Sequence, residues 1–253
     1  MIHSTAVIES DIPSDASIGP YSVIGPDVKL GSGVRVAAHV CLMGPATIGD
    51  SVSIGPSAVI GTDPQDLKYN NERTEVIIGQ RTVIREFANI NRGTVDSGRT
   101  IVGSDCLIMA YVHIAHDCEI GDRVILANSV NMAGHVQIGS DVTIGGVVPI
   151  HQFVRIGEYS MIGGGYRVSR DVPPFVLAGG YPLRVSALNR IGLRRKGFNR
   201  ERLDDLDTVF RYLFRSDGIL TSKARELMEN TELSEDSRKL ADFILSSNRG
   251  VIS

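Results

Sequence analysis

The sequence predicts a parallel β-helix of hexapeptide repeats, followed by a small α-helical appendage. An aliphatic residue recurs every six positions between Ile18 and Val168. The chain of 253 residues contains 27 glycines but only 7 Phe, 7 Tyr and no Trp. Six residues are too few for a helix and a turn, but they are enough for a short strand and a corner. A core with so few aromatic rings must be narrow and regular.

One aliphatic position sets the register of the hexads. The residue after it is often glycine, and the residue four positions after it is usually small or β-branched. This register holds over twelve consecutive units, which chance does not explain. The aliphatic positions are Ile18, Ile24, Leu30, Val36, Leu42, Ile48, Ile54, Ile60, Ile78, Ile84, Ile90, Val102, Ile108, Ile114, Ile120, Leu126, Met132, Ile138, Ile144, Ile150, Ile156, Ile162 and Val168.

Three such strands close one triangular coil of 18 residues. We expect the aliphatic residue to point inward, the glycine after it to permit the backbone angles of the corner, and the small residue to fill the next corner. Stacked coils pair each strand with those above and below it, so only the two ends have free edges. The period does not fix the handedness. The hexapeptide pattern, however, resembles that of the left-handed β-helix proteins, so we expect a left-handed parallel β-helix.

Two interruptions and one change in composition divide the chain. Polar segments at residues 62–74 and 92–100 break the hexads, and we expect both to be loops expelled from the coil. Loops on a rigid scaffold commonly carry function. Pro173 and Pro174 are expected to end the strand pairing, because proline cannot donate to a ladder. We therefore assign residues 1–185 to the β-helix and residues 186–253 to a C-terminal α-helical domain.

The C-terminal segment contains three predicted helices. Asn199 is a candidate N-cap for a helix with Leu203, Leu206, Phe210, Leu213 and Phe214 on one stripe. Thr221 and Ser234 are candidate caps for the next two helices. We expect this appendage to cover one end or flank of the β-helix.

Charge, cysteine count and hydropathy exclude several classes of protein. A net charge of -3 provides no positive field for nucleic-acid binding. Three cysteines do not suit a disulfide framework and indicate a reducing compartment. The start of the chain has no signal-peptide pattern, and no window approaches the roughly 18 apolar residues of a spanning helix. We therefore expect a cytoplasmic protein without an integral membrane segment.

Four of the six histidines lie close together in the repeat, at His113, His116, His135 and His151. Their spacing follows the 18-residue coil, so three of them should form a column with about 4.8 Å between coils, and His113 should lie at the preceding corner. None occupies an inward position.

Three interpretations of this histidine column remain open from spacing alone. The histidines are solvated surface residues, or they form a zinc site between subunits, as in the γ-class carbonic anhydrases. In the third interpretation one imidazole is a general base, because its unperturbed pKa of about 6.5 lies near neutral pH. Spacing does not decide which histidine is the base. Asp117, next to His116, is suited to orient that ring.

A basic stretch at the start of the appendage is suited to bind a diphosphate or an acidic protein. Glu201 is the only acidic residue within it. The alternative is a solvated charged helix edge. Its members are Arg184, Arg190, Arg194, Arg195, Lys196, Arg200 and Arg202.

Six motifs in order along the chain resemble the UDP-N-acetylglucosamine O-acyltransferase family of lipid A biosynthesis. Each motif is modest, but six in the right order are specific, and they extend over nearly the whole chain. The motifs are Pro64–Tyr69, His113–Cys118, Asn128 with Ala133–His135, Val148–Phe153, Asp171–Pro174 and Gly192–Phe198.

A flat prism has no deep cleft of its own, so a symmetric oligomer is expected independently of this resemblance.

The resemblance implies a homotrimer with active sites between neighbouring subunits, and no cofactor or metal. The enzyme would transfer an (R)-3-hydroxyacyl group from acyl carrier protein to the 3-hydroxyl of UDP-N-acetylglucosamine. It implies that His116 is the general base, that Asp117 supports it and that the Gly134 N–H stabilises the oxyanion. The implied substrate-binding residues are Asp66, Lys68, His113, His135, His151, Gln152, Asn189, Arg195 and Lys196. The basic stretch would suit the acidic carrier protein.

Three further points concern specificity. Gly164 matches the position that limits the acyl pocket in this family, and a glycine there implies a longer acyl chain. Asn91 stands where several family members carry histidine, and Lys196 where arginine is common. The sister N-acyltransferase has an additional N-terminal domain, whereas here the repeat begins near Ile2. A 3-amino acceptor, a zinc enzyme of the carbonic anhydrase type and a non-catalytic scaffold remain as alternatives.

Overall fold

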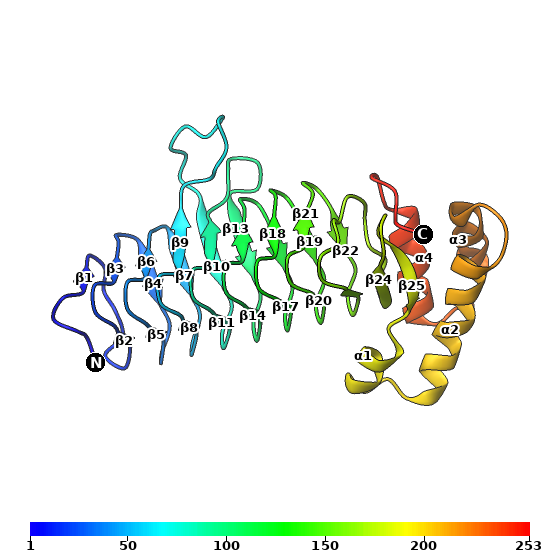
Figure 1. Ribbon diagram of the computed structural model, residues 1–253, viewed down its shortest axis with the longest axis horizontal. Coiled ribbons are helices and arrows are strands. Elements are labelled where there is room, and N and C mark those ends of the chain that lie inside the picture. Colours follow the sequence, from blue (N-terminus) through cyan, green and yellow to red (C-terminus); the bar gives the residue numbers. More distant parts are fainter.

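A computed structural model of the chain describes all residues, Met1–Ser253, as an elongated three-sided prism with helices at its C-terminal end (Figure 1). The strands form three sheets, which we name A, B and C, and successive hexads enter them in that order. We name the turns between them the A/B, B/C and C/A corners. The predicted class, a parallel β-helix of hexapeptide repeats with a C-terminal helical appendage, is confirmed.

Most strands contain only two to four residues. Sheet A contains β2(Ser17–Ile18), β5(Arg35–Val36), β8(Ser53–Ile54), β11(Val83–Ile84), β14(Leu107–Ile108), β17(Ile125–Leu126), β20(Thr143–Ile144), β23(Met161–Ile162), β24(Val176–Gly179) and β25(Arg184–Leu188). Sheet B contains β1(Val7–Ile8), β3(Val23–Ile24), β6(Cys41–Leu42), β9(Val59–Thr62), β12(Asn89–Asn91), β15(His113–Ile114), β18(Asn131–Met132) and β21(Pro149–Ile150). Sheet C contains β4(Val28–Leu30), β7(Ala46–Ile48), β10(Glu75–Ile78), β13(Arg99–Val102), β16(Glu119–Ile120), β19(Gln137–Ile138) and β22(Arg155–Ile156).

The predicted inward positions form the core. In sheet B, Ile90, Ile114 and Met132 stack in register on successive coils, and each is 0 % exposed. The small residues four positions after an aliphatic one, such as Val112 after Ile108 and Val130 after Leu126, are also 0 % exposed. Each coil therefore buries one aliphatic and one small side chain per face, which explains why the repeat has little use for aromatic residues.

The expected role of the repeated glycines was wrong. The positive φ at a corner falls on a non-glycine residue three positions after the aliphatic one, for example Asp117 (φ 60) and His135 (φ 60). The glycine directly after the aliphatic residue is needed for close approach between coils. A Cβ on Gly121 would lie 2.7 Å from the Ser140 nitrogen, and a Cβ on Gly139 would lie 2.6 Å from the Glu158 nitrogen.

The end of the β-helix also differs from the prediction. Pro173 and Pro174 do not end the pairing, because β24 follows them directly and pairs parallel with β23. β24 then pairs antiparallel with β25, which extends to Leu188 and so crosses the expected boundary after residue 185. The prolines occupy a corner, where no ladder hydrogen bond is required.

Four helices follow, α1(Arg190–Arg195), α2(Arg200–Arg215), α3(Leu220–Glu229) and α4(Glu235–Leu245), and they cover the C-terminal end of the prism (Figure 1). The predicted caps Asn199 and Ser234 accept hydrogen bonds from Arg202 N and Ser237 N. The cap at Thr221 was wrong: α3 begins at Leu220, and its N-cap, Ile219, makes no side-chain hydrogen bond. This earlier start packs Leu220 against the core. None of the four helices combines the length and hydropathy that crossing a bilayer requires.

Candidate active site

The B/C corner gathers most of the predicted catalytic groups. The first loop, residues 63–74, leaves this corner after β9, and the second loop, residues 92–98, leaves it one coil later, after β12. Both project from the same edge of the prism (Figure 1). The next coils bring His116, Gly134, His135 and Gln152 to this corner, because each follows a strand of sheet B. Two expelled loops and three coils thus meet at one edge.

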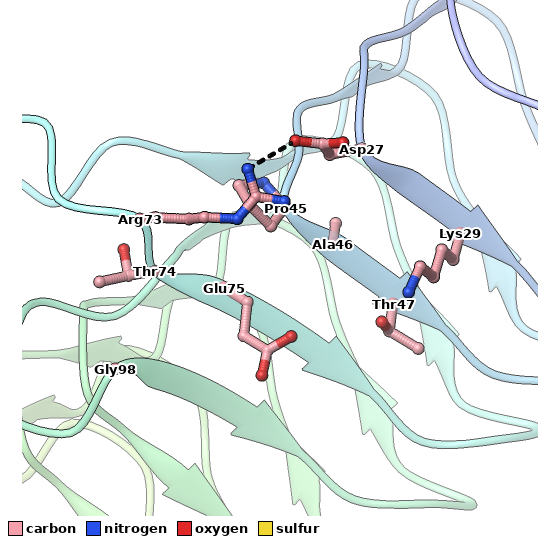
Figure 2. Close-up of a pocket in the computed structure, with 9 residues that line it drawn as sticks. All are labelled: Asp27, Lys29, Pro45, Ala46, Thr47, Arg73, Thr74, Glu75 and Gly98. Atoms are coloured by element: carbon pink, nitrogen blue, oxygen red, sulfur yellow. Dashed lines mark ion pairs between the residues drawn. The ribbon is translucent and has the colours of Figure 1, made fainter.

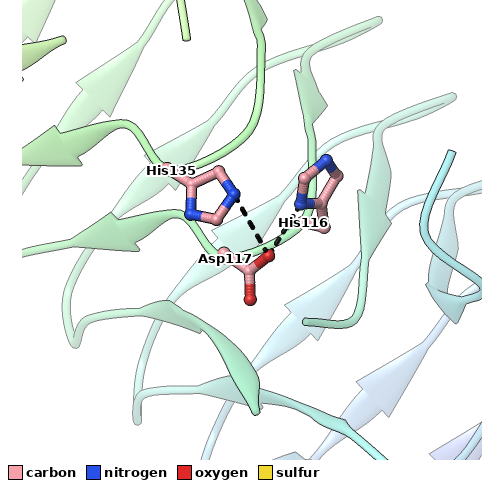
Figure 3. A group of neighbouring side chains, drawn as sticks. All are labelled: His116, Asp117 and His135. Atoms are coloured by element: carbon pink, nitrogen blue, oxygen red, sulfur yellow. Dashed lines mark hydrogen bonds and ion pairs between the residues drawn. The ribbon is translucent and has the colours of Figure 1, made fainter. Parts of the chain in front are cut away.

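His116 and Asp117 form a buried hydrogen-bonded pair at this corner (Figure 3). The His116 Nδ1 lies 2.7 Å from the Asp117 Oδ2. The Asp117 side chain is 0 % exposed and that of His116 is 9 % exposed. A carboxylate only accepts, so Nδ1 must carry the proton, and Nε2 on the other side of the ring then carries the lone pair. When the ring is neutral, this arrangement leaves Nε2 as a proton acceptor.

The second loop holds the Asp117 carboxylate. Oδ1 accepts from Thr94 N at 2.9 Å, Oδ2 accepts from Thr94 Oγ1 at 2.7 Å, and the Ser97 hydroxyl donates to Oδ1. Burial alone would raise the pKa of Asp117, but the hydrogen bonds from Ser97, Thr94 and His116 outweigh it and lower this pKa to about 2. The carboxylate therefore stays ionised at neutral pH and stabilises any imidazolium formed at His116.

Gly134 packs directly on the His116 ring. A Cβ at this position would lie 2.5 Å from Cε1 and 2.7 Å from Nε2 of His116, so only glycine leaves the ring in place. The Gly134 N–H donates to no acceptor within the chain. It is thus a free backbone donor beside the nitrogen that would act as the base, which is the requirement for an oxyanion-binding group.

His135 lies on the other side of Asp117. Its Nε2 is 3.6 Å from Asp117 Oδ2, its ring meets His116 edge to face at 5.2 Å, and it stacks on Phe153 at 4.6 Å. Ligand atoms of His116, Asp117 and His135 lie within 4.8 Å of one another (Figure 3). Both oxygens of Asp117 already accept hydrogen bonds, and the His116 Nδ1 donates one of them. This donor set suits an oriented imidazole better than a zinc ion, which needs free lone pairs.

A pocket of about 380 Å³ lies in front of this pair. Its lining includes Gln65 from the first loop, and His113, His116, Gly134 and Gln152 from the prism. Four predicted residues from three coils therefore line a single pocket, together with Gln65 of the first loop.

Two of the predicted histidines have different surroundings from those expected. His113 was expected at a corner but lies within β15, where its Nδ1 is 2.7 Å from Asn89 Oδ1. Burial, with a smaller effect of charge on His116, lowers the pKa of His113, so His113 is neutral at pH 7. His151 lies at the B/C corner but is exposed, with its Nδ1 2.8 Å from Arg249 Nη2.

The first loop carries Asp66 and Lys68 directly after Gln65, which lines this pocket. Asp66 Oδ1 accepts from the Lys68 backbone nitrogen at 2.9 Å, which gives this part of the loop a tight local turn. The Lys68 side chain makes no hydrogen bond or ion pair within the chain, and Leu67 between them is fully exposed. The Lys68 ammonium is therefore free for a ligand, whereas one oxygen of Asp66 is held by the turn.

Four predicted residues lie at other corners of the chain. Asn189 caps α1 and its Nδ2 donates to Tyr159 O at the C/A corner. Lys196 Nζ lies 2.7 Å from Asp141 Oδ1, also at that corner. Arg195 is exposed on α1, and Gly164 lies at the A/B corner after β23. One chain alone does not bring these four residues to His116.

The sequence did not indicate the roles of Thr94 and Ser97, or of Arg92 beside them. Short hydroxyl side chains are common in any loop, so residue type gave no signal. The available signal was position, since the 92–100 interruption lies in the coil directly before that of His116. Much of the basic stretch is ion-paired within the chain, as with Arg190 to Asp204 and Arg202 to Asp236.

The comparisons with known proteins show the family of the chain. Residues 171–252 match the model of UDP-N-acetylglucosamine O-acyltransferase, domain 2, and residues 9–44 and 99–134 match the bacterial transferase hexapeptide model. Fold and site together define a hexapeptide-repeat acyltransferase.

Full-length relatives identify the family. A Syntrophobacter fumaroxidans protein named acyl-[acyl-carrier-protein]–UDP-N-acetylglucosamine O-acyltransferase is 46% identical over 255 residues, which cover 99% of each chain. The crystal structure of UDP-N-acetylglucosamine O-acyltransferase from Moraxella catarrhalis has a TM-score of 0.95 and 41% identity, over 100% of this chain and 99% of that one. A structure from Acinetobacter baumannii has a TM-score of 0.94 and 40% identity over the same shares. The chain belongs to the UDP-N-acetylglucosamine O-acyltransferase family.

Proposed function

We propose that this acyltransferase moves an (R)-3-hydroxyacyl chain from acyl carrier protein to the 3-hydroxyl of UDP-N-acetylglucosamine, in lipid A biosynthesis. The observation that carries the proposal is the buried His116–Asp117 pair, which leaves one imidazole nitrogen free beside the Gly134 N–H. Acyl transfer to an alcohol needs both a base and an oxyanion donor. The names of the full-length relatives support the choice of donor and acceptor.

In the proposed reaction His116 Nε2 takes the proton of the sugar 3-hydroxyl as that oxygen attacks the thioester carbonyl. The Gly134 N–H stabilises the negative charge on the carbonyl oxygen. The tetrahedral intermediate collapses by cleavage of the C–S bond, and the imidazolium returns its proton to the departing thiolate of the carrier. Asp117 stays ionised throughout because its pKa is about 2.

Substrate binding is assigned to residues near the pocket and to four residues at other corners of the chain. Asp66 and Lys68 hold the sugar. His113, His135, His151 and Gln152 line the nucleotide-sugar and acyl contacts. Asn189, Arg195 and Lys196 surround the uridine diphosphate, and Gly164 lies at the position that limits the acyl pocket, where a glycine leaves room for a longer chain.

The last four residues require a second subunit. They lie at the A/B and C/A corners, whereas His116 lies at the B/C corner. In a closed ring of three prisms, each prism turns a different side to each neighbour, so residues from different corners meet at the interface. We therefore propose a homotrimer with its active sites between subunits.

Mixed trimers test the shared site. Inactive His116→Ala and Arg195→Ala proteins are unfolded, mixed and refolded together. An intersubunit site predicts that some mixed trimers regain one wild-type site and with it activity. A site within one chain predicts no recovery.

Product analysis tests the reaction itself. UDP-N-acetylglucosamine is incubated with a mixture of 3-hydroxyacyl carrier proteins, and the product is fragmented in a mass spectrometer. An O-linked acyl group at sugar position 3 is expected. Preference for a 3-amino sugar, seen as an N-linked acyl product, would favour that alternative acceptor. Stoichiometric zinc on the purified protein, together with no acyl transfer, would overturn the proposal.

A further inference from the structure

Arg92 connects the two loops at the B/C corner. Its Nη1 donates to Gly44 O at 3.2 Å and to Gly61 O at 3.1 Å. Its Nε and Nη2 donate to the Tyr69 hydroxyl at 3.2 and 2.8 Å, and Nη2 also pairs with the Asp63 carboxylate. One side chain from the second loop therefore contacts two points of the first loop and two carbonyls of the prism.

The burial of Arg92 indicates that these contacts have a structural role. Its side chain is only 15 % exposed, and a buried guanidinium is tolerated only when its donors are paired. Of the two carbonyls that it satisfies, that of Gly61 lies in β9 directly before the first loop, and that of Gly44 lies at the same corner one coil earlier. Asn91 beside it donates through Nδ2 to Thr62 Oγ1 and Asp63 O, at 3.0 and 2.9 Å. Both residues thus hold the start of the first loop.

The ion pair at the other end of the first loop is weaker than these contacts. At its far end Arg73 pairs with Asp27 at 3.1 Å, beside a polar pocket of about 250 Å³ on the sheet C side (Figure 2). The two side chains are 77 % and 54 % exposed, and exposed pairs contribute little. Asp66 and Lys68 lie between Asp63 and Tyr69, so the contacts of Arg92 bracket both.

We infer that Arg92 is a positioning residue that fixes the conformation of the first loop so that Asp66 and Lys68 face the acceptor sugar. The inference rests on the proposed function for the identity of the acceptor. The forked guanidinium is essential, because a lysine keeps the charge but cannot reach Tyr69, Asp63 and two carbonyls together.

Kinetics of Arg92→Gln, with Arg73→Gln as the matched control, test this inference. Arg92→Gln should raise the KM for UDP-N-acetylglucosamine about tenfold or more and leave kcat within about threefold, because the cost is in ordering a binding loop. Arg92→Lys should resemble Arg92→Gln. The pH profile of kcat should not change, since His116 and Asp117 are untouched. Arg73→Gln should match the wild type.

Hydrogen exchange gives a readout that does not depend on activity. In the absence of substrate, the amides of residues 63–74 should exchange several-fold faster in Arg92→Gln than in wild type or Arg73→Gln. Tyr69→Phe removes two of the donations from Arg92 and leaves the buried guanidinium otherwise intact, so it provides a milder test if Arg92→Gln does not fold. It should show the same changes at smaller size.

Two results would overturn the inference. The first is unchanged exchange of residues 63–74 in Arg92→Gln or, if that protein does not fold, in Tyr69→Phe. The second is a fall in kcat with an unchanged KM, which would place Arg92 in the chemical step. If the wild type transfers no acyl group to UDP-N-acetylglucosamine, the proposed function fails, while the exchange result still decides the role of Arg92.

Discussion

Replacement of Gly134 by alanine should disable His116 without unfolding the protein. The added Cβ would lie 2.5 Å from His116 Cε1 and 2.7 Å from Nε2. Carbon atoms in contact normally lie about 3.5–4.0 Å apart, so the ring must retreat by about 1 Å. Such a retreat breaks the 2.7 Å bond between His116 Nδ1 and Asp117. The φ of Gly134 is not positive, so alanine has no backbone penalty there.

The expected cost follows from this displacement. Misplacing a catalytic group by about 1 Å can lower a rate about a hundredfold, which corresponds to about 2.7 kcal/mol of transition-state stabilisation. Alanine keeps the backbone N–H at position 134, so the loss of activity reports the displacement of the base His116 and not the loss of the oxyanion donor. Steady-state transfer with saturating donor measures it, and thermal unfolding checks that the fold persists. Gly25→Ala is the control, because its new Cβ meets nothing closer than 3.3 Å.

A double-mutant cycle isolates the cause. In a His116→Ala background the methyl group of Gly134→Ala has space, so it should change neither the residual rate nor the unfolding free energy by more than about 0.5 kcal/mol. Wild-type activity of the Gly134→Ala protein, or an equal further loss in the His116→Ala background, would refute the contact as the reason for this glycine.

The other predictions concern the base, its carboxylate and the acyl pocket. His116→Ala should lower transfer by about 10²–10⁴-fold with the trimer and the fold unchanged, as measured by rates and light scattering. The lowering of the Asp117 pKa from 3.8 to about 2 contributes about 2 kcal/mol to the free energy of unfolding. This contribution is fully present above pH 3.8 and is lost as the pH falls towards 2. Urea unfolding across that range should show this loss for the wild type, whereas Asp117→Asn should be about 2 kcal/mol less stable at pH 7. The control is Asp96→Asn, whose side chain is 72 % exposed, and its stability should equal that of the wild type. Gly164→Met should shift the preferred donor to a shorter hydroxyacyl chain, and an unchanged preference in a competition assay would remove Gly164 from the acyl pocket.

The fold could be predicted because the hexad imposes one requirement in every coil. An inward position flanked above and below by identical positions favours an aliphatic side chain, so Ile114 and its equivalents are Ile, Leu or Val in every coil except at Met132. The reason for the glycines could not be predicted. Positive φ and close backbone approach both select glycine, and sequence does not separate them; here the approach between coils decides, as at Gly121. Pro174 was misjudged because a corner position makes proline compatible with a continuing ladder.

The candidate site was predictable only in part. His116 and Asp117 are adjacent in sequence, so their pairing needed no tertiary information. The donors that lower the pKa of Asp117 come from Thr94 and Ser97, more than nineteen positions earlier, and their hydroxyls meet it only because the second loop folds back onto the next coil. The hydroxyl-bearing residue types alone are too common to indicate such a contact.

The two loop insertions leave the same corner in successive coils, the longer one first, and this order lets them act together. Ile60 and Ile78 are separated by 18 residues where the hexad needs six, and Ile90 and Val102 by 12. The shorter insertion lies in the coil directly before that of His116, and its Thr94 and Ser97 contact Asp117. The longer insertion, one coil further away, must extend to reach the same pocket, and it depends on Arg92 of the shorter one for its support. Exchanging the two loops would place the longer loop over Asp117 and leave no segment able to carry Gln65 to the pocket. A chain with the loops exchanged should therefore keep the β-helix and lose acyl transfer.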